Sequence, residues 1–417
     1  MLTEIKRDRY LNRLIARKWN GSVKVVTGLR RCGKSYLLFK LFKDHLVSEG
    51  VDPKNIISIA LDDIRNRPMR DPDVLYRTVT DSVGDGEYYL LLDEIQFVDG
   101  FEDVINGFRH VPRLDIYVTG SNSKMLSGDI LTEFRGRGDE VRVQPLSFSE
   151  FASAFNGTAD EAWNIYLTFG GLPELFGRTD SEQKTTYLQN LMKEVYLKDL
   201  IEHNEIRLTN ELDMMTDLLC SSVGSLTNPL KISNTLKTTG SSRTSEETVS
   251  KYLSFLEESF LFERSKRYDI KGRKYFGTPS KYYAADVGLR NARLNFRQQK
   301  MTHIMENVLY NELRSRGFSV DVGVVETKTT ENGVTNFKQL EIDFVANKGD
   351  QRYYIQCAYR VPDEDKKEQE LRPFLKVGDS FRKIIVVGDD IRRWTDDNGV
   401  ITIGVKEFLL DESYTNL

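Results

Sequence analysis

The stretch GLRRCGKS, residues 28–35, has the spacing G-x-x-x-x-G-K-[ST]. Backbone N–H groups of such a glycine-rich loop, and of the helix after it, point at phosphate oxygens. Lys34 would reach the β- and γ-phosphates, and the Ser35 hydroxyl would ligate Mg²⁺. The loop therefore predicts a site for ATP with Mg²⁺. The residues expected to form it are Gly28, Leu29, Arg30, Arg31, Cys32, Gly33, Lys34, Ser35 and Tyr36.

A pair of carboxylates ends the apolar run EYYLLLDEIQ, residues 87–96. Asp93 would hold Mg²⁺ through water, and Glu94 would act as the general base on the attacking water. The alternative is a buried strand that ends in a solvated acidic turn. Beside the glycine loop, the adjacent glutamate favours ATP hydrolysis over ATP binding alone.

Further candidates follow the apolar run LDIYVTGSN, residues 114–122. Ser121 or Asn122 could orient the water, and the alternative is a plain turn. Arg135 and Arg137 could contact the γ-phosphate within the subunit or from a neighbouring copy, which would require a homo-oligomer. The alternative for both arginines is a surface ion pair.

Five apolar, β-rich runs must position these side chains. They are residues 22–27, 55–63, 87–96, 114–122 and 139–147. Because helical segments lie between the runs, we expect an α/β domain with a parallel, doubly wound sheet. The first nineteen residues are expected to form a helix that packs on this domain rather than a signal peptide.

The motifs GLRRCGKS, LLLDEIQ, TGSNSKML, RGRGDEVRVQPLSFSEF and YLTFGGLPEL together resemble a prokaryotic family of AAA-type P-loop ATPases. The resemblance is to the division with an additional strand and a catalytic glutamate. In that family the ATPase is fused to a C-terminal domain of unknown function. The resemblance implies an AAA-type ATPase domain at residues 1–150, but no settled biological role.

Residues 151–208 are expected to form a helical connector or lid. The sequence GGLP at 170–173 resembles the glycine-x-proline motif of signalling P-loop ATPases, in which the proline packs near adenine. By that resemblance Pro173 would contact the nucleotide and the helices would form a nucleotide-sensing lid. The alternative is a helix–helix turn, with glycine ending one helix and proline starting the next.

Residues 209–290 are expected to form a winged helix of three helices and a hairpin. The third helix has a capping box at Thr244 and Glu247. The hairpin, residues 261–286, is rich in basic residues, which can contact phosphate, so DNA or RNA is the expected partner. Packing against the ATPase or a protein partner is the alternative. The basic residues are Arg264, Lys266, Arg267, Lys271, Arg273, Lys274 and Lys281.

Residues 291–417 have the layout of a restriction-endonuclease-like domain, in which carboxylates hold Mg²⁺ and a lysine positions water. Glu306 and Asp343 match the acids of such a site. Gln356 stands where a second strand acid is expected, and Ala358 stands where the lysine is expected. Because alanine cannot replace a lysine, we expect a binding platform that does not cut nucleic acid.

Composition narrows the class of protein. The net charge of −4 restricts any nucleic-acid surface to a local patch. Cys32, Cys220 and Cys357 lie far apart without metal spacing, which favours the cytoplasm. No apolar run approaches the ~18 residues of a membrane span, so no membrane partner is expected. We expect an ATP-driven switch that engages nucleic acid. The alternatives are a signalling-type ATPase that recognises a protein and an ATP-gated nuclease.

Overall fold

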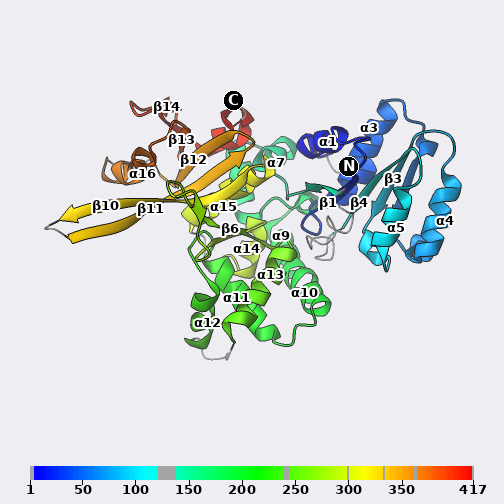
Figure 1. Ribbon diagram of the computed structural model, residues 1–417, viewed down its shortest axis with the longest axis horizontal. Helices are drawn as coiled ribbons and strands as arrows, with labels where there is room; N and C mark the ends of the chain where they lie inside the picture. The colour runs from blue at the N-terminus through cyan, green and yellow to red at the C-terminus, as the bar shows by residue number, and fades with distance from the viewer. Residues whose placement is uncertain are drawn as a thin grey trace.

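The computed structural model describes residues 4–120, 138–238, 244–297, 300–331, 334–360 and 364–415. Figure 1 shows an N-terminal sheet with helices, a helical middle region, and a second sheet with helices in the C-terminal part. The predicted site residues Ser121, Asn122, Arg135 and Arg137 lie outside the described residues.

The N-terminal sheet has five parallel strands in the order β2-β3-β4-β1-β5. Their bounds are β1 Val23–Thr27, β2 Ile56–Ala60, β3 Tyr88–Asp93, β4 Leu114–Thr119 and β5 Gly138–Arg142. Strand β4 lies between β1, which leads into the glycine loop, and β3, which ends in the carboxylates. The predicted parallel α/β sheet is confirmed.

Helices cover both faces of this sheet because successive side chains of a strand point to opposite sides. On β3, Leu90 and Leu92 pack in the same cluster as residues of α4 and α5, whereas Tyr89 and Leu91 belong to the cluster on the other face. That second face carries α1 and the helix after the glycine loop. The bounds are α1 Asp8–Ile15, α2 Lys34–Tyr36, a π-helical stretch Leu37–Phe42, α3 Lys43–Ser48, α4 Pro72–Ser82 and α5 Phe101–Phe108.

The middle region consists of helices and one antiparallel strand pair, β6 with β9. The expected capping box of the third helix is wrong. Ser245 caps α13, since its hydroxyl accepts from the N–H of Thr248 at 3.2 Å. Thr244 is buried, and its carbonyl accepts from Ser233 at 2.7 Å. The bounds are α7 Phe148–Ala154, α8 Ala159–Phe169, α9 Ser181–Asn190, α10 Lys198–His203, α11 Thr209–Ser221, α12 Pro229–Thr238, α13 Glu246–Glu258, β6 Phe262–Ser265, β9 Lys281–Ala284 and α14 Val287–Arg293.

The C-terminal sheet has eight strands in the order β14-β15-β13-β12-β11-β10-β7-β8. Strands β10 and β11 form a long arm that projects from the rest of the molecule (Figure 1). Strand β7 lies parallel to β10, so residues 267–275 of the basic hairpin belong to this sheet. The bounds are β7 Arg267–Asp269, β8 Lys274–Tyr275, α15 Met301–Ser315, β10 Ser319–Glu331, β11 Val334–Lys348, β12 Gln351–Ala358, α16 Glu364–Val377, β13 Arg382–Val387, β14 Trp394–Thr395, β15 Val400–Gly404 and α17 Val405–Leu410.

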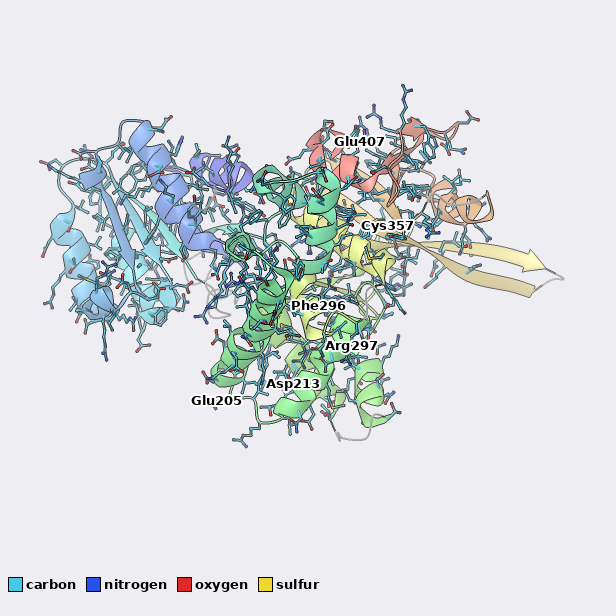
Figure 2. All side chains as sticks on the ribbon, turned by 180° about the vertical axis from the view of Figure 1, so that it is seen from behind. Glu205, Asp213, Phe296, Arg297, Cys357 and Glu407 are labelled. Atoms are coloured by element: carbon cyan, nitrogen blue, oxygen red, sulfur yellow. The ribbon has the colours of Figure 1, made fainter. Side chains whose placement is uncertain are left out.

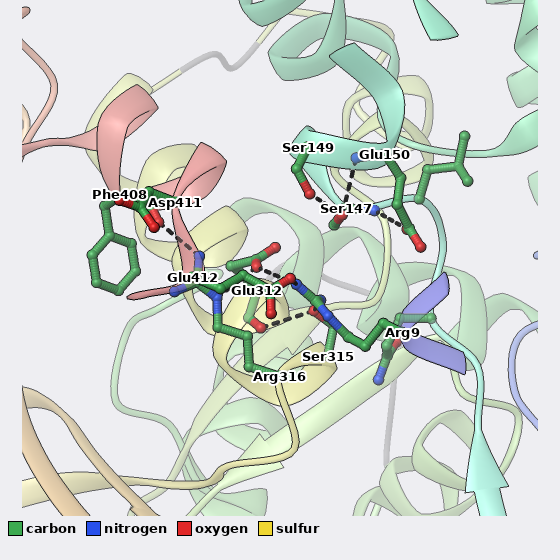
Figure 3. A network of polar contacts seen from close by, with 12 residues as sticks. Arg9, Ser147, Ser149, Glu150, Glu312, Ser315, Arg316, Phe408, Asp411 and Glu412 are labelled. Atoms are coloured by element: carbon green, nitrogen blue, oxygen red, sulfur yellow. Dashed lines mark hydrogen bonds and ion pairs between the residues drawn. The ribbon is translucent and has the colours of Figure 1, made fainter. Parts of the chain in front are cut away.

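Helix α1 joins the N-terminal and C-terminal parts. Arg9 donates to Glu312 of α15 at 3.0 Å, and also to Ser315 and Glu412 (Figure 3). Glu312 accepts a second bond, at 2.7 Å, from Arg316, and both side chains are almost fully buried. A charge network therefore connects the N-terminal end of the chain to its C-terminal end.

The three cysteines are buried and free. Figure 2 shows one of them, Cys357, among the strands of the C-terminal part, far from Asp213 in the helical middle region. Within the described ranges, no helix has the length and apolar character needed to cross a membrane.

Candidate nucleotide site and a buried ion cluster

The glycine loop lies between β1 and α2 and is crowded by backbone. Gly28 has φ +134°, and a Cβ there would lie 2.1 Å from the carbonyl oxygen of Val143. A larger residue would thus displace the loop. Lys34 is buried, and its ammonium donates to the carbonyl oxygens of Gly28 and Leu29 at 3.0 and 3.1 Å. The lysine is therefore held directly over the loop.

Arg7 lies outside the motif in the sequence but stabilises this loop through hydrogen bonds. Its guanidinium is buried and donates to the carbonyl oxygens of Cys32 at 2.9 Å and Gln144 at 2.7 Å. It also forms an ion pair with Glu150 at 3.0 Å. The sequence patterns gave no sign of this role, because Arg7 precedes the motif and has no characteristic spacing from it.

Ser35 and Asp93 lie near each other at the carboxyl ends of β1 and β3. Burial raises the pKa of Asp93, and the nearby hydroxyls of Thr119 and Ser35 oppose that rise. Hydroxyl and carboxylate oxygens are the hard ligands that Mg²⁺ prefers, so the pair fits the ion.

Thr119, the last residue of β4, contacts both acidic positions. Its hydroxyl donates to Asp93 and accepts from the N–H of Glu94 at 3.0 Å. Glu94 has φ +54° and ψ +52°, a left-handed conformation that is uncommon for a residue other than glycine. Thr119 thus supports the backbone that presents Glu94. The sequence pattern pointed to Ser121 and Asn122 after this strand and not to Thr119.

A cavity of about 1300 Å³ lies beside the loop. Lys34, Ser35 and Glu94 line one side of it, and Pro173 and Tyr196 of the connector line another. The cavity therefore combines the predicted phosphate-binding residues with the predicted lid.

Polar contacts link the connector to the loop. Tyr196 donates from its hydroxyl to the carbonyl oxygen of Arg30 at 2.7 Å. Arg30 also pairs with Asp199, and Arg31 pairs with Glu174 at 3.2 Å, both on exposed side chains. Exposed ion pairs are weak, so these contacts can exchange at small cost.

The GGLP segment joins α8 to a short helix at Pro173–Gly177. Gly170 ends α8 with φ +78°, as the turn interpretation expects, and Pro173 also lines the cavity. The N–H of Gly171 donates to Asp286 at 2.7 Å. Asp286 caps α14 and is buried, and this burial raises its pKa to about 6. The turn is thus attached to the residues that follow β9.

Lys281 of β9 lies in a buried cluster of carboxylates, and its grouping with phosphate-contacting residues is wrong. It is 3% exposed. Its ammonium lies 2.9 Å from Glu306, 2.9 Å from Glu341 and 3.4 Å from Asp343. Burial lowers the pKa of Lys281, but the three carboxylates outweigh that effect and raise it above its ordinary value. Burial raises the pKa of Glu306 to about 7 against the influence of Lys281.

Gln356 forms hydrogen bonds with residues in and beside this cluster. Its carbonyl oxygen accepts from the N–H of Asp343 at 2.7 Å, and its amide donates to Glu370 at 3.0 Å. Asp343 in turn accepts from the N–H of Cys357 at 2.9 Å. A lysine therefore does accompany Glu306 and Asp343, but it comes from β9 instead of β12. Across the described ranges, no three His, Cys, Asp or Glu side chains are arranged to hold a metal ion.

The other basic residues of the hairpin divide into two groups. Arg264 donates to Ser280 at 3.0 Å, and Arg267 donates to Gln339 at 2.7 Å, so both are used within the fold. Lys271, Arg273 and Lys274 are exposed at the turn between β7 and β8, and Lys266, just before β7, is exposed as well. These four residues remain available as a phosphate-contacting surface.

Two family models match the chain. An AAA domain matches residues 20–152, and a domain described as Domain of unknown function (DUF8612) matches residues 160–300. The second match spans both the predicted connector and the predicted winged helix. The winged helix, the restriction-endonuclease-like domain and the cytoplasmic location stay predictions.

Two relatives match over nearly the whole chain. An uncharacterized protein of Haemophilus influenzae is 34% identical over 413 residues, which is 97% of this chain and 98% of the relative. An uncharacterized protein of Methanocaldococcus jannaschii is 28% identical over 408 residues, which is 92% of this chain and 87% of the relative.

A solved structure shares the fold. A Walker-type ATPase of Pyrococcus abyssi has a TM-score of 0.50 and 15% identity, covering 70% of this chain and 96% of its own. The chain therefore belongs to the family of the Haemophilus influenzae protein, an AAA-type P-loop family in which a separate domain of unknown function follows the AAA domain.

Proposed function

We propose that the chain binds ATP with Mg²⁺ in the cavity beside the glycine loop and hydrolyses it. The observation that carries the proposal is the grouping of Lys34, Ser35 and Glu94 along one cavity, with Asp93 near Ser35. Lys34 contacts the phosphates, and Ser35 and Asp93 hold Mg²⁺. When bound, the ion neutralises charge on the β- and γ-phosphates.

Glu94 is the proposed general base. Water forms a bond to the γ-phosphorus, the bond from that phosphorus to the bridging oxygen of ADP breaks, and the proton of the water passes to the Glu94 carboxylate. Thr119 holds the backbone N–H of Glu94, so the carboxylate starts from a fixed position. A fixed base needs less reorganisation at the moment of reaction.

The substitution Glu94→Gln tests this proposal. We expect turnover to fall on the order of a hundredfold while ATP stays bound, because an amide cannot take the proton. Glu87→Gln is the matched control, since Glu87 is an exposed acid at the other end of the same apolar segment. Steady-state phosphate release and equilibrium binding of ATP are measured for both variants. Equal turnover in Glu94→Gln and wild type would mean that the base is another residue.

We further propose that nucleotide state controls contact with DNA or RNA. The supporting observation is the exposed cluster of Lys271, Arg273 and Lys274 at the β7–β8 turn. Reversing the charges of Arg273 and Lys274 should weaken binding and lower the salt dependence by about one unit of slope for each phosphate that is no longer neutralised. Lys54→Glu, in an exposed position of the ATPase part, is the control.

Binding is measured by fluorescence anisotropy with single-stranded and duplex oligonucleotides at several salt concentrations. If no binding is found at low salt with ATP, ADP or no nucleotide, the nucleic-acid proposal fails. The same exposed turn would then favour the alternative of a protein partner with an acidic surface.

A further inference from the structure

Gln96 is a second side chain held against the proposed general base. It lies two residues after Glu94, in the short helix Ile95–Phe97, and it lines the same cavity. Its amide nitrogen donates to Oε2 of Glu94. A carboxylate can only accept hydrogen bonds, so the NH₂ end of the amide must face Glu94 and the carbonyl end must face away.

The two ends of the Gln96 amide differ in their hydrogen bonding. Within the described part of the chain, Oε1 of Gln96 is buried and has no hydrogen-bond partner. Leaving a buried acceptor unpaired costs about 1–3 kcal/mol. The bond to Glu94 is therefore the contact that sets the orientation of this amide.

Glu94 is thus held at both its backbone and its side chain. Thr119 accepts from its backbone N–H at 3.0 Å, and Gln96 donates to its carboxylate. The left-handed backbone of Glu94 directs the chain into the short helix that carries Gln96. The local turn therefore brings the side chains of residues 94 and 96 together.

We propose that Gln96 is a positioning residue for ATP hydrolysis, which acts by fixing the direction of the Glu94 carboxylate toward the attacking water. This inference rests on the proposed ATPase function. It adds a residue outside the glycine loop and the two acids. Because Gln96 acts through Glu94, its removal affects the chemical step and not the binding of ATP.

The test compares Gln96→Met with Gln183→Met. Methionine keeps the length of the side chain but cannot donate to a carboxylate. Gln183 is exposed on α9, so it receives the same change away from the cavity. We expect kcat of Gln96→Met to fall about tenfold or more, with the Kd for ATP changed by less than about twofold. Gln183→Met should match wild type in both quantities.

A second set of variants distinguishes a positioning role of Gln96 from a general structural role. In the Glu94→Gln background, Gln96→Met should lower the remaining single-turnover rate by less than about twofold, because residues that act as a unit are not additive. Gln96→Glu, which has nearly the same size but places a carboxylate against Glu94, should lower kcat as well. This variant serves if the methionine variant does not fold.

The outcomes are distinguishable. If wild type hydrolyses ATP and Gln96→Met keeps full kcat, the positioning role is wrong while the proposed function stands. If Gln96→Met lowers the rate by the same factor with and without Glu94, or weakens ATP binding in parallel, the residue is structural and the inference fails. If wild type shows no hydrolysis with any partner, the proposed function and this inference both fail.

Discussion

Replacing Lys281 by methionine should destabilise the C-terminal part of the molecule more than any other single loss of charge in the basic hairpin. The substitution keeps most of the volume of the side chain and removes only the ammonium group. Glu306, Glu341 and Asp343 would then lose the cation that lies between them. Uncompensated carboxylates in a buried site are costly because they cannot recover their hydration.

The size of the destabilisation caused by Lys281→Met depends chiefly on Glu306. The side chain of Glu306 is 8% exposed, whereas those of Asp343 and Glu341 are 18% and 37% exposed and can be solvated in part. Breaking a buried ion pair by removing one partner typically costs about 3–5 kcal/mol, and we expect a value in this range. Adding Glu306→Gln to Lys281→Met should recover a large part of it, since no buried charge then remains at that position.

The stability lost in Lys281→Met should also depend on pH. The pKa of Glu306, about 7 in the folded protein, lies above its ordinary value of 4.5. A carboxyl with a raised folded pKa contributes stability below its unfolded pKa and loses that contribution as pH rises through the folded pKa. Without Lys281 this pKa rises further. The destabilisation of Lys281→Met should therefore be larger at pH 8 than at pH 5.

Hydrogen exchange is the suitable assay, because unfolding of a chain with several parts need not be two-state. Peptides from β9, β11 and α15 should lose protection in Lys281→Met and regain it in the double variant. Lys271→Met, an exposed lysine on the same hairpin, is the control. A loss below about 1 kcal/mol, independent of pH and of Glu306, would refute the assignment of Lys281 as the buried counter-ion.

Two other predictions concern the glycine loop and the carboxylate that binds the GGLP turn. Gly28→Ala should abolish measurable ATP binding in an equilibrium assay, because its Cβ would lie 2.1 Å from the Val143 carbonyl, whereas Gly277→Ala, in open space, should bind normally. Measured by hydrogen exchange in peptides from α14, the stability of wild type relative to Asp286→Asn should fall by about 3 kcal/mol as pH rises from below 4 to above 6. The reason is that burial raises the pKa of Asp286 from 3.8 to about 6, so the folded state holds this proton more tightly. A difference that is constant with pH would contradict the buried carboxyl.

The sequence was sufficient to predict the N-terminal sheet and several of the residues that line the cavity. The glycine loop and the apolar strand with its two acids are local patterns, and local patterns can be recognised without knowledge of the fold. The strand that carries Asp93 and the helix that begins at Lys34 lie where the spacing predicted. Thr119 could have been found as well, because it ends the strand next to the acids.

Other features depend on contacts that no local pattern records. Lys281 precedes Glu306 by twenty-five residues and Asp343 by sixty-two, and only the packing of β9 on α15 brings them together. Arg7 reaches the loop in the same way, through tertiary contact. Strand β10 was missed because its sequence after Val325 consists of Thr, Lys and Glu, with no apolar residues to give the alternation typical of a strand.

A short segment joins the candidate nucleotide cavity to the ion cluster. Lys281 is in β9, and Asp286, which follows that strand, accepts from the N–H of Gly171, two residues before Pro173 at the cavity. Residues 281–285 are all buried, so β9 has little freedom to move independently of its neighbours. Any shift of the GGLP turn on ATP binding must therefore displace Asp286 or break its bond to Gly171. In the first case the movement would pass along β9 to Lys281. A conformational change at the proposed nucleotide site would then alter the ion pairs between Lys281 and the carboxylates of the C-terminal part.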